Sequence, residues 1–309
     1  MRRKTLRAGS LAAGLGLVLS ACVGITGCAA QGSRWDPATM DPPAEAQPPS
    51  MASARIPSGD VAMNAIVYTP AGPGPHPVAL LLHGLPGDER NLDLAQAIRR
   101  AGWSVVFFHY RGAWGSPGDF SFHHVLEDVD AAVAWTRTDE VRERFAFDDA
   151  PRALVGHSMG GFAALAAGAG NADVGCIASL AGANMGLMGA ALRDDAALAD
   201  ASALTLAYDT AGPLAGTSGL ALVAELASSA AEFDLRRRVP ELARRKTLLV
   251  AALADRYVPV EQHHTPLVLA LRDAGADVRD VELPTDHAFS GSRIALARAL
   301  ISWLREDCP

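Results

Sequence analysis

The chain has 309 residues, 50% of them hydrophobic, and a formal net charge of −7 at pH 7. That length is enough for one large hydrophobic core, so we expect one main domain. Beyond residue 7, lysine and arginine form no run longer than three residues, which argues against nucleic acid as a partner.

The first residues are typical of an export signal. Residues 1–7 carry four positive charges, and the apolar stretch over residues 8–19 is too short to span a bilayer. Leu19-Ser20-Ala21-Cys22 resembles the lipobox of bacterial lipoproteins, in which the cysteine is lipidated. We therefore expect residues 1–21 to be a signal peptide and the protein to be an exported lipoprotein, held on a membrane through Cys22.

Three alternatives to this interpretation stay open. Cys28 also closes a lipobox-like stretch, but it lies further beyond the apolar run. An ordinary cleaved signal peptide would leave no anchor. Arg2-Arg3 partly matches a twin-arginine signal, so the sequence leaves the export route undecided between the Sec and twin-arginine systems.

Residues 22–57 are predicted to be a lipidated flexible linker, because from residue 31 onward they are rich in Pro, Ala, Ser and Gln and poor in large apolar residues. The catalytic domain is expected over residues 58–309. Its two cysteines, Cys176 and Cys308, show no metal-ligand spacing, and the sequence does not assign a disulfide. Cys176 is expected to pack as a small buried hydrophobe.

Apolar strand-like runs alternate with helical patterns along this domain. This order predicts an α/β fold with a mostly parallel sheet covered by helices on both faces, and an edge strand at 61–68. The further strands are expected at 78–82, 104–108, 153–155, 174–180, 247–253 and 278–283. The helices are expected at 92–101, 124–136, 159–168, 260–274 and 290–304.

The segment of about residues 183–246 is too long for an ordinary connection, and it is dominated by Ala, Leu, Gly and Met. We interpret it as a helical cap over the active site, although a peripheral insertion is an alternative. Flexible apolar side chains near its start predict an apolar acyl pocket, with Arg193 as the one nearby cation. They are Met185, Leu187, Met188 and Leu192.

Residues 156–161, Gly-His-Ser-Met-Gly-Gly, follow a short apolar strand and open an Ala-rich helix. This is the context of the G-x-S-x-G nucleophile elbow, a turn so tight that glycines are needed on either side of the serine. The pattern predicts Ser158 as the nucleophile of a serine hydrolase.

A serine hydroxyl needs a base to take its proton and an acid to orient that base. The fold places them downstream in the order acid, then histidine, and Asp255 and His287 each follow a predicted strand. Asp286 is the rival acid, but a neighbour of the base rarely reaches its far ring nitrogen. Two other histidines, His263 and His264, are expected on a helix surface.

The oxyanion hole is expected to use the backbone N–H groups of Met159 and Leu85, because Pro86 has no N–H to donate. His83 is interpreted as pinning that loop, and His157 is expected to point away from the serine. We expect no metal and no cofactor.

In this order of motifs, residues 60–305 resemble the α/β-hydrolase superfamily. The His-Gly loop at 83–87 and the Tyr-Arg-Gly turn at 110–112 are similar to those of dienelactone hydrolases and of prolyl-oligopeptidase-type catalytic domains. The resemblance implies acyl transfer through a serine ester, with a small ester or short peptide or amide as substrate. Because only a linker precedes the domain, an esterase is favoured over a serine peptidase or amidase. A non-catalytic binding lipoprotein is a third possibility.

Overall fold

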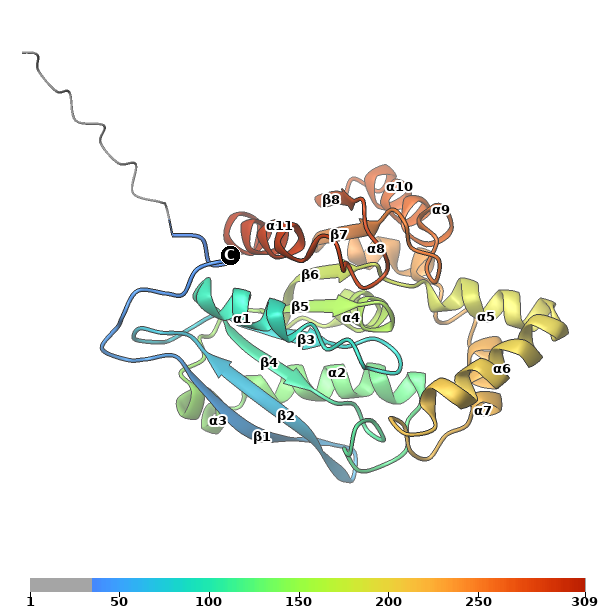
Figure 1. The fold of residues 1–309 in the computed structure, drawn as a ribbon, viewed down its shortest axis with the longest axis horizontal. Coiled ribbons are helices and arrows are strands. Elements are labelled where there is room, and N and C mark those ends of the chain that lie inside the picture. The colour runs from blue at the N-terminus through green and yellow to red at the C-terminus, as the bar shows by residue number, and fades with distance from the viewer. Residues whose placement is uncertain (1–34, 309) are drawn as a thin grey trace, which may run out of the picture. The chain divides into compact units, whose positions relative to one another are not determined.

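The computed structural model describes residues 35–308, and the eight strands of these residues form one sheet in the order β1-β2-β4-β3-β5-β6-β7-β8 (Figure 1). Neighbours from β4 to β8 are parallel, whereas β2 is antiparallel to both β1 and β4. The predicted mostly parallel α/β fold is therefore confirmed. The strands are β1 Ser50–Ser58, β2 Val61–Thr69, β3 Val78–Leu82, β4 Ser104–Phe108, β5 Arg152–His157, β6 Val174–Leu180, β7 Lys246–Ala252 and β8 Val278–Leu283.

The central strands show why the sequence contains unbroken apolar runs. All five residues of β3 are buried, and Leu80 lies between Val106 of β4 and Leu154 of β5. A parallel strand with helices on both faces has no solvated side, so it needs apolar residues at every position rather than at alternate ones.

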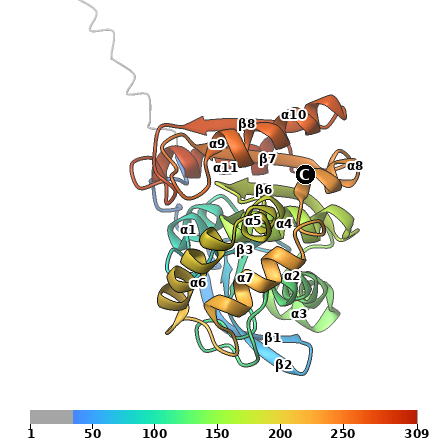
Figure 2. The ribbon, with the colours of Figure 1, turned by 90° about the vertical axis from the view of Figure 1, so that its right-hand side faces the viewer.

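Two helical layers cover the sheet. Val129 of α2 and Phe162 of α4 belong to the core on one face, whereas Leu94 of α1 and Leu300 of α11 belong to the core on the other. Figure 2 shows α1 and α2 on opposite sides of the strands. The helices outside the cap are α1 Leu92–Arg100, α2 Phe122–Arg137, α3 Asp139–Phe145, α4 Met159–Gly170, α9 Val260–His263, α10 Thr265–Asp273 and α11 Arg293–Glu306.

The helix predicted over 260–274 is two helices, α9 and α10, which meet at His264. Pro266 lies in the first turn of α10, where its missing N–H is tolerated but a continuous helix would lose a hydrogen bond. Short α3 was not predicted from the sequence.

The predicted linker is wrong for residues 50–57. They form β1, which pairs along its whole length with β2, so β2 is not the edge strand. Alternate residues of β1 point inward, with Ala54, Ile56 and Ser58 buried. The predicted signal segment and both candidate lipidation sites, Cys22 and Cys28, lie outside the described residues.

The predicted helical insertion lies between β6 and β7. It contains α5 Met185–Asp194, α6 Ala196–Thr210, α7 Gly219–Ser228, a 3-10 turn at Leu235–Arg238 and α8 Val239–Leu242. In Figure 1 the arrows of β4 and β5 point toward α5, α6 and α7. Backbone hydrogen bonds from Ala215 N to Gly112 O, 2.7 Å, and from Trp114 N to Pro213 O, 2.8 Å, join this cap to the loop after β4.

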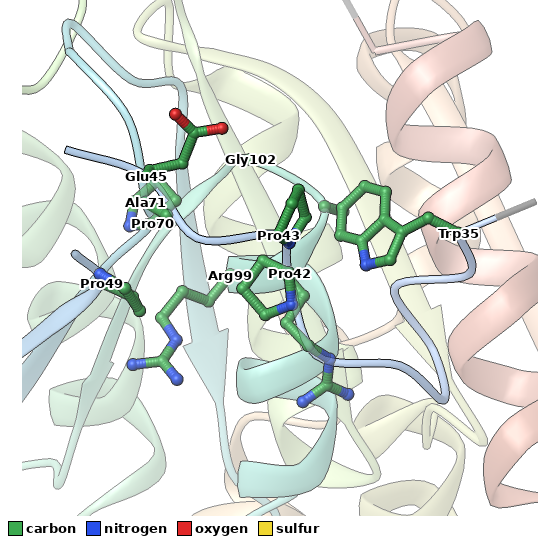
Figure 3. A pocket seen from close by; sticks show the side chains of 11 residues that line it. Trp35, Pro42, Pro43, Glu45, Pro49, Pro70, Ala71, Arg99 and Gly102 are labelled. Atoms are coloured by element: carbon green, nitrogen blue, oxygen red, sulfur yellow. The ribbon is translucent and has the colours of Figure 1, made fainter. Parts of the chain in front are cut away.

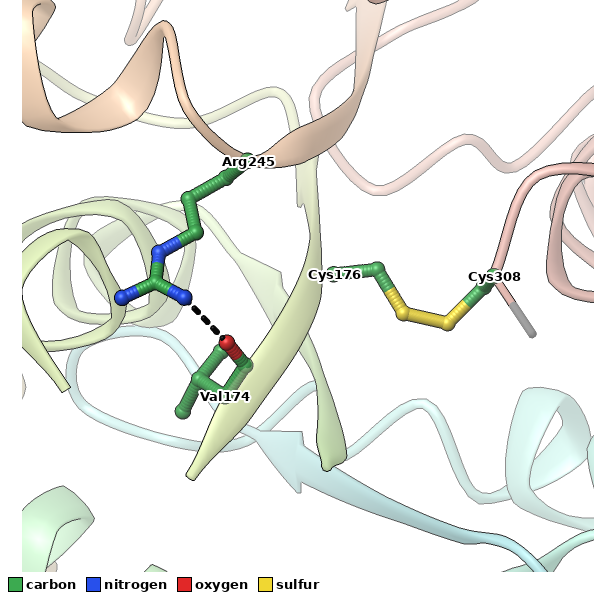
Figure 4. The surroundings of a disulfide bond; sticks show 4 residues. All are labelled: Val174, Cys176, Arg245 and Cys308. Atoms are coloured by element: carbon green, nitrogen blue, oxygen red, sulfur yellow. Dashed lines mark hydrogen bonds between the residues drawn. A yellow bond between two sulfur atoms is a disulfide. The ribbon is translucent and has the colours of Figure 1, made fainter. Parts of the chain in front are cut away.

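A disulfide joins Cys176 of β6 to Cys308 after α11, with a Cα–Cα distance of 5.8 Å (Figure 4). Cys176 is buried as expected, but its partner could not be assigned from the sequence. Arg245 donates to the carbonyl of Val174 nearby, at 2.8 Å. The disulfide ties the C-terminal end of the described chain to the centre of the sheet.

Candidate active site

Ser158 lies in a sharp turn between β5 and α4. Its backbone has φ 57° and ψ −120°, a conformation that L-residues rarely adopt. A methyl group added at Gly156 would lie 1.9 Å from the carbonyl oxygen of Gly160, and one added at Gly160 would lie 2.3 Å from the carbonyl oxygen of Leu82. The predicted strand–turn–helix context is therefore present, and its glycines are required by close backbone contacts.

The loop after β3 lies against this turn. A methyl group added at Gly84 would lie 3.0 Å from Ser158 Cβ and 3.5 Å from its Oγ. Among the hydrogen bonds of residues 35–308, none uses the N–H of Leu85 or of Met159. The two N–H groups predicted to form the oxyanion hole therefore have no internal hydrogen-bond partner, and their role stays a prediction.

Asp255 and His287 meet at the carboxyl ends of the parallel strands, in the loops after β7 and β8. Asp255 Oδ2 accepts a hydrogen bond from His287 Nδ1 at 2.5 Å. Its Oδ1 accepts from the backbone N–H groups of Tyr257, at 2.8 Å, and Val258, at 2.9 Å. The Asp255 side chain is 1% exposed and the His287 side chain 18%, so the carboxylate is shielded while the ring reaches solvent.

The rival acid is turned away from the ring. Asp286 Oδ1 accepts a hydrogen bond from Ser290 N at 2.8 Å, and this bond holds the pKa of its carboxyl below the ordinary value. For Asp255, burial alone would raise the pKa, but the hydrogen bonds from His287 and Val258 outweigh burial and leave the pKa lowered. Asp255 is therefore ionised at neutral pH, as the orienting acid must be.

His157, which directly precedes Ser158, has its ring centroid 4.8 Å from that of His287. Among the hydrogen bonds of residues 35–308, none joins Ser158 Oγ to His287 Nε2. Such contacts are often loose without substrate and tighten when it binds.

Among the other histidines, the prediction for His83 is confirmed and the prediction for His263 and His264 is wrong. His83 is buried, its Nδ1 donates to Gly84 O at 2.8 Å, and burial lowers its pKa to about 4, so it pins the loop as predicted. His263 and His264 are not surface residues. His263 Nδ1 accepts from Asn184 N at 3.0 Å, and His264 Nε2 pairs with Asp280 at 2.8 Å.

The first cap helix places its apolar residues in two environments. Met185 and Leu192 are buried in the core, whereas Leu187 and Met188 are half-buried. Arg193 does not turn inward, because it is exposed and pairs with Asp194 at 2.8 Å. None of these residues lines either of the two cavities described next, so the acyl pocket stays a prediction.

Two cavities lie away from Ser158. One, of about 230 Å³, lies near the start of β4 and is lined by residues that include Trp35, Pro42, Pro43 and Arg99 (Figure 3). The other, of about 310 Å³, runs along β1 and β2 to His109. Within residues 35–308 there is no cluster of three or more metal-ligating side chains, and no helix there is long and apolar enough to cross a membrane.

Comparisons with known proteins agree with this architecture. The model of the family described as "Alpha/beta hydrolase family" matches residues 79–299. YheT of Escherichia coli (strain K12), which is named as a candidate esterase, is 31% identical over 112 residues, which cover 34% of this chain and 31% of that protein.

Solved structures show the same fold at low identity. An acylaminoacyl peptidase of Pyrococcus horikoshii is 17% identical with a TM-score of 0.61, over 84% of this chain and 42% of that chain. An esterase of Rhizomucor miehei is 18% identical with a TM-score of 0.61, over 84% of both chains. The chain thus spans less than half the length of the peptidase and about a third of the length of YheT.

Proposed function

Since this chain belongs to the alpha/beta hydrolase family, we propose that it cleaves carboxylic esters through a serine ester formed on Ser158. One observation carries the proposal: the hydrogen bond of 2.5 Å between Asp255 and His287, which lie, like the serine in its strained turn, at the carboxyl ends of the strands. This arrangement supplies a nucleophile, a base and an orienting acid.

In the proposed reaction, Ser158 Oγ attacks the ester carbonyl while His287 Nε2 takes its proton. The N–H groups of Met159 and Leu85 stabilise the oxyanion, and Asp255 stabilises the imidazolium. His287 then gives the proton to the departing alcohol. A water molecule, activated by the same ring, releases the acid and restores the serine.

A serine peptidase or amidase would use the same residues, and the likeness to an acylaminoacyl peptidase keeps it as the second candidate. The esterase is favoured because both YheT and the Rhizomucor miehei protein are named as esterases. A binding lipoprotein without activity is the third candidate, and it has no use for a buried Asp255 aligned on His287.

The proposed substrates are short to medium linear acyl esters. Leu187 and Met188 offer an adaptable apolar wall, and Arg193, the cation next to them in the sequence, is already paired at the surface. Each further buried methylene contributes up to about 0.8 kcal/mol until the pocket is full. A charged acyl group finds no partner on this wall and is rejected.

The proposed location is outside the cytoplasm, on a membrane through a lipid at Cys22. The disulfide between Cys176 and Cys308 supports export, because such bonds persist in oxidising compartments. Cys22→Ala is expected to release the protein from membranes or to block its processing. Full retention of Cys22→Ala, with release of Cys28→Ala, would move the anchor to Cys28.

The proposal is tested with p-nitrophenyl esters from acetyl to octanoyl, measured beside aminoacyl anilides. We expect kcat/KM to rise severalfold per carbon and then to fall, with esters cleaved far better than anilides. A profile that is flat with chain length, or a preference for anilides, would contradict the proposed substrate class.

A further inference from the structure

His157 ends β5 directly before the elbow, and it touches the loop that carries His287. The residue is 4% exposed, and its Nε2 lies 2.8 Å from the backbone carbonyl oxygen of His287. A carbonyl oxygen only accepts hydrogen bonds, so Nε2 carries the proton and donates it. The sequence gave no sign of this contact, because the two residues are 130 positions apart.

The other nitrogen of this ring has no partner. Nδ1 of His157 is buried and, within residues 35–308, forms no hydrogen bond. Burial, with the nearby His287 as a second cause, lowers the pKa of His157 to about 4, so the ring is neutral at neutral pH. A buried polar atom without a partner destabilises the folded state, a cost that an apolar side chain would avoid. The hydrogen bond from Nε2 is the gain that offsets this cost.

That hydrogen bond holds the backbone of His287, which has no other hydrogen-bond partner within residues 35–308. Neighbouring carbonyls and amides of the loop have other partners: Arg293 donates to Ala288 O at 3.0 Å, and Phe289 N donates to Asp286 O at 2.9 Å. Among the hydrogen bonds of residues 35–308, the bond from His157 is the one that reaches the backbone of His287. The ring of His287 is held separately, by Asp255.

We propose that His157 is a positioning residue for His287, fixing its backbone while Asp255 fixes its ring. The inference rests on the proposed function, in which His287 is the general base. Both constraints are needed because Nε2 of His287 must come within hydrogen-bond reach of Ser158 Oγ, and a displacement of about 1 Å can cost about 100-fold in rate. His157 itself contacts neither the substrate nor the transferred proton.

The test compares His157→Leu with His157→Gln in the full-length protein. Leucine fills the space without a donor, whereas the glutamine amide places an N–H near the position of Nε2. We expect His157→Leu to lower kcat on a soluble p-nitrophenyl ester by about 10- to 100-fold, with KM changed less than about twofold. Labelling of Ser158 by a fluorophosphonate should slow by the same factor. His157→Gln should recover most of the rate.

His76 provides a matched control, because it is also a buried histidine with a lowered pKa. It precedes β3 and so lies at the amino ends of the parallel strands, opposite the ends that carry Ser158 and His287. His76→Leu should lower the melting temperature without lowering kcat. The inference is overturned if His157→Leu keeps the wild-type kcat, if His157→Gln is as slow as His157→Leu, or if His76→Leu loses as much kcat. Ser158→Ala distinguishes failure of the proposed function from failure of the positioning role. Full activity of Ser158→Ala refutes the proposed function. An inactive Ser158→Ala together with a fully active His157→Leu refutes only the positioning role.

Discussion

The loops at the carboxyl ends of β7 and β8 differ sharply from the outer helix of the cap. The Asp255 carboxylate accepts three hydrogen bonds and is almost fully buried. In α6, by contrast, only Ala203 and Thr210 are buried, and Leu204 and Tyr208 are 74% and 87% exposed. The acid–base pair is therefore fixed by many polar contacts, while the outer cap is held by few. The substitutions below compare the loops after β7 and β8 with contacts elsewhere in the molecule, including those that join the cap to α2.

The largest effects are expected at the proposed nucleophile and base. Ser158→Ala and His287→Ala should each lower kcat at least about 1,000-fold, and the double variant should cost little more, because the residues act as one unit. Initial rates on a p-nitrophenyl ester measure this. Near-normal turnover in either single variant would remove that residue from the mechanism.

The two aspartates beside His287 form a matched pair. Asp255→Asn should lower kcat by up to about 10,000-fold, because an amide at this position favours the wrong imidazole tautomer. Asp286→Asn should change kcat by less than about tenfold, since its carboxylate accepts from Ser290 N instead. A larger loss in Asp286→Asn than in Asp255→Asn, at equal melting temperature, would mean that the acid is misassigned.

The disulfide is expected to affect stability and not chemistry. It closes a loop across a sequence separation of 132 residues, so Cys308→Ser should lower the free energy of unfolding by between about 2 and 5 kcal/mol. Urea unfolding measures the loss, and kcat/KM of the folded variant should stay at the wild-type value. Equal unfolding midpoints for the oxidised and reduced wild-type protein would refute the stabilising role.

The smallest effect is expected where the cap joins α2. His123 of α2 pairs with Glu225 of α7 at 2.7 Å and with Glu232 at 3.4 Å. Burial alone would lower the pKa of His123, but these two carboxylates outweigh it and raise the pKa. The stabilisation is therefore fully present below the unfolded-state pKa of about 6.5 and is lost as pH rises through the higher folded-state value.

His123→Gln should accordingly destabilise the protein more at pH 5.5 than at pH 8.5, as measured by urea unfolding at both values. Because the His123 side chain is 40% exposed, solvent screening keeps the difference small. A greater loss at pH 8.5 would show that the pair does not act through the charge of His123.

Much of the fold could be predicted from the sequence because its strongest signals are local. The buried strands are unbroken apolar runs, and the turn at 156–161 carries its own glycines. β1 was missed because Ser50–Ser58 consists mostly of small residues and includes Pro57, a composition that also suits a linker. The signal that was available is that Ala54 and Ile56 are separated by one polar residue, which is the alternation of a strand with one solvated face.

Two contacts that join distant parts of the chain could not be predicted. Cys176 and Cys308 carry no mark of their pairing in the sequence, and the same holds for His157 and the carbonyl of His287. The prediction for His263 was wrong because a helical pattern shows only which positions recur on one face of a helix. The hydrogen bond from Asn184 to His263 depends on how distant segments pack together, which the pattern does not show.

Intact-protein mass spectrometry after treatment with a fluorophosphonate tests the serine-ester account most directly. The account predicts one covalent adduct per chain, mapped by proteolysis to the peptide that contains Ser158. The adduct should be absent in Ser158→Ala and should form at least about 100-fold more slowly in His287→Ala, because the serine then lacks its base. An adduct on another residue, or equal labelling of Ser158→Ala and the wild-type protein, would contradict the account.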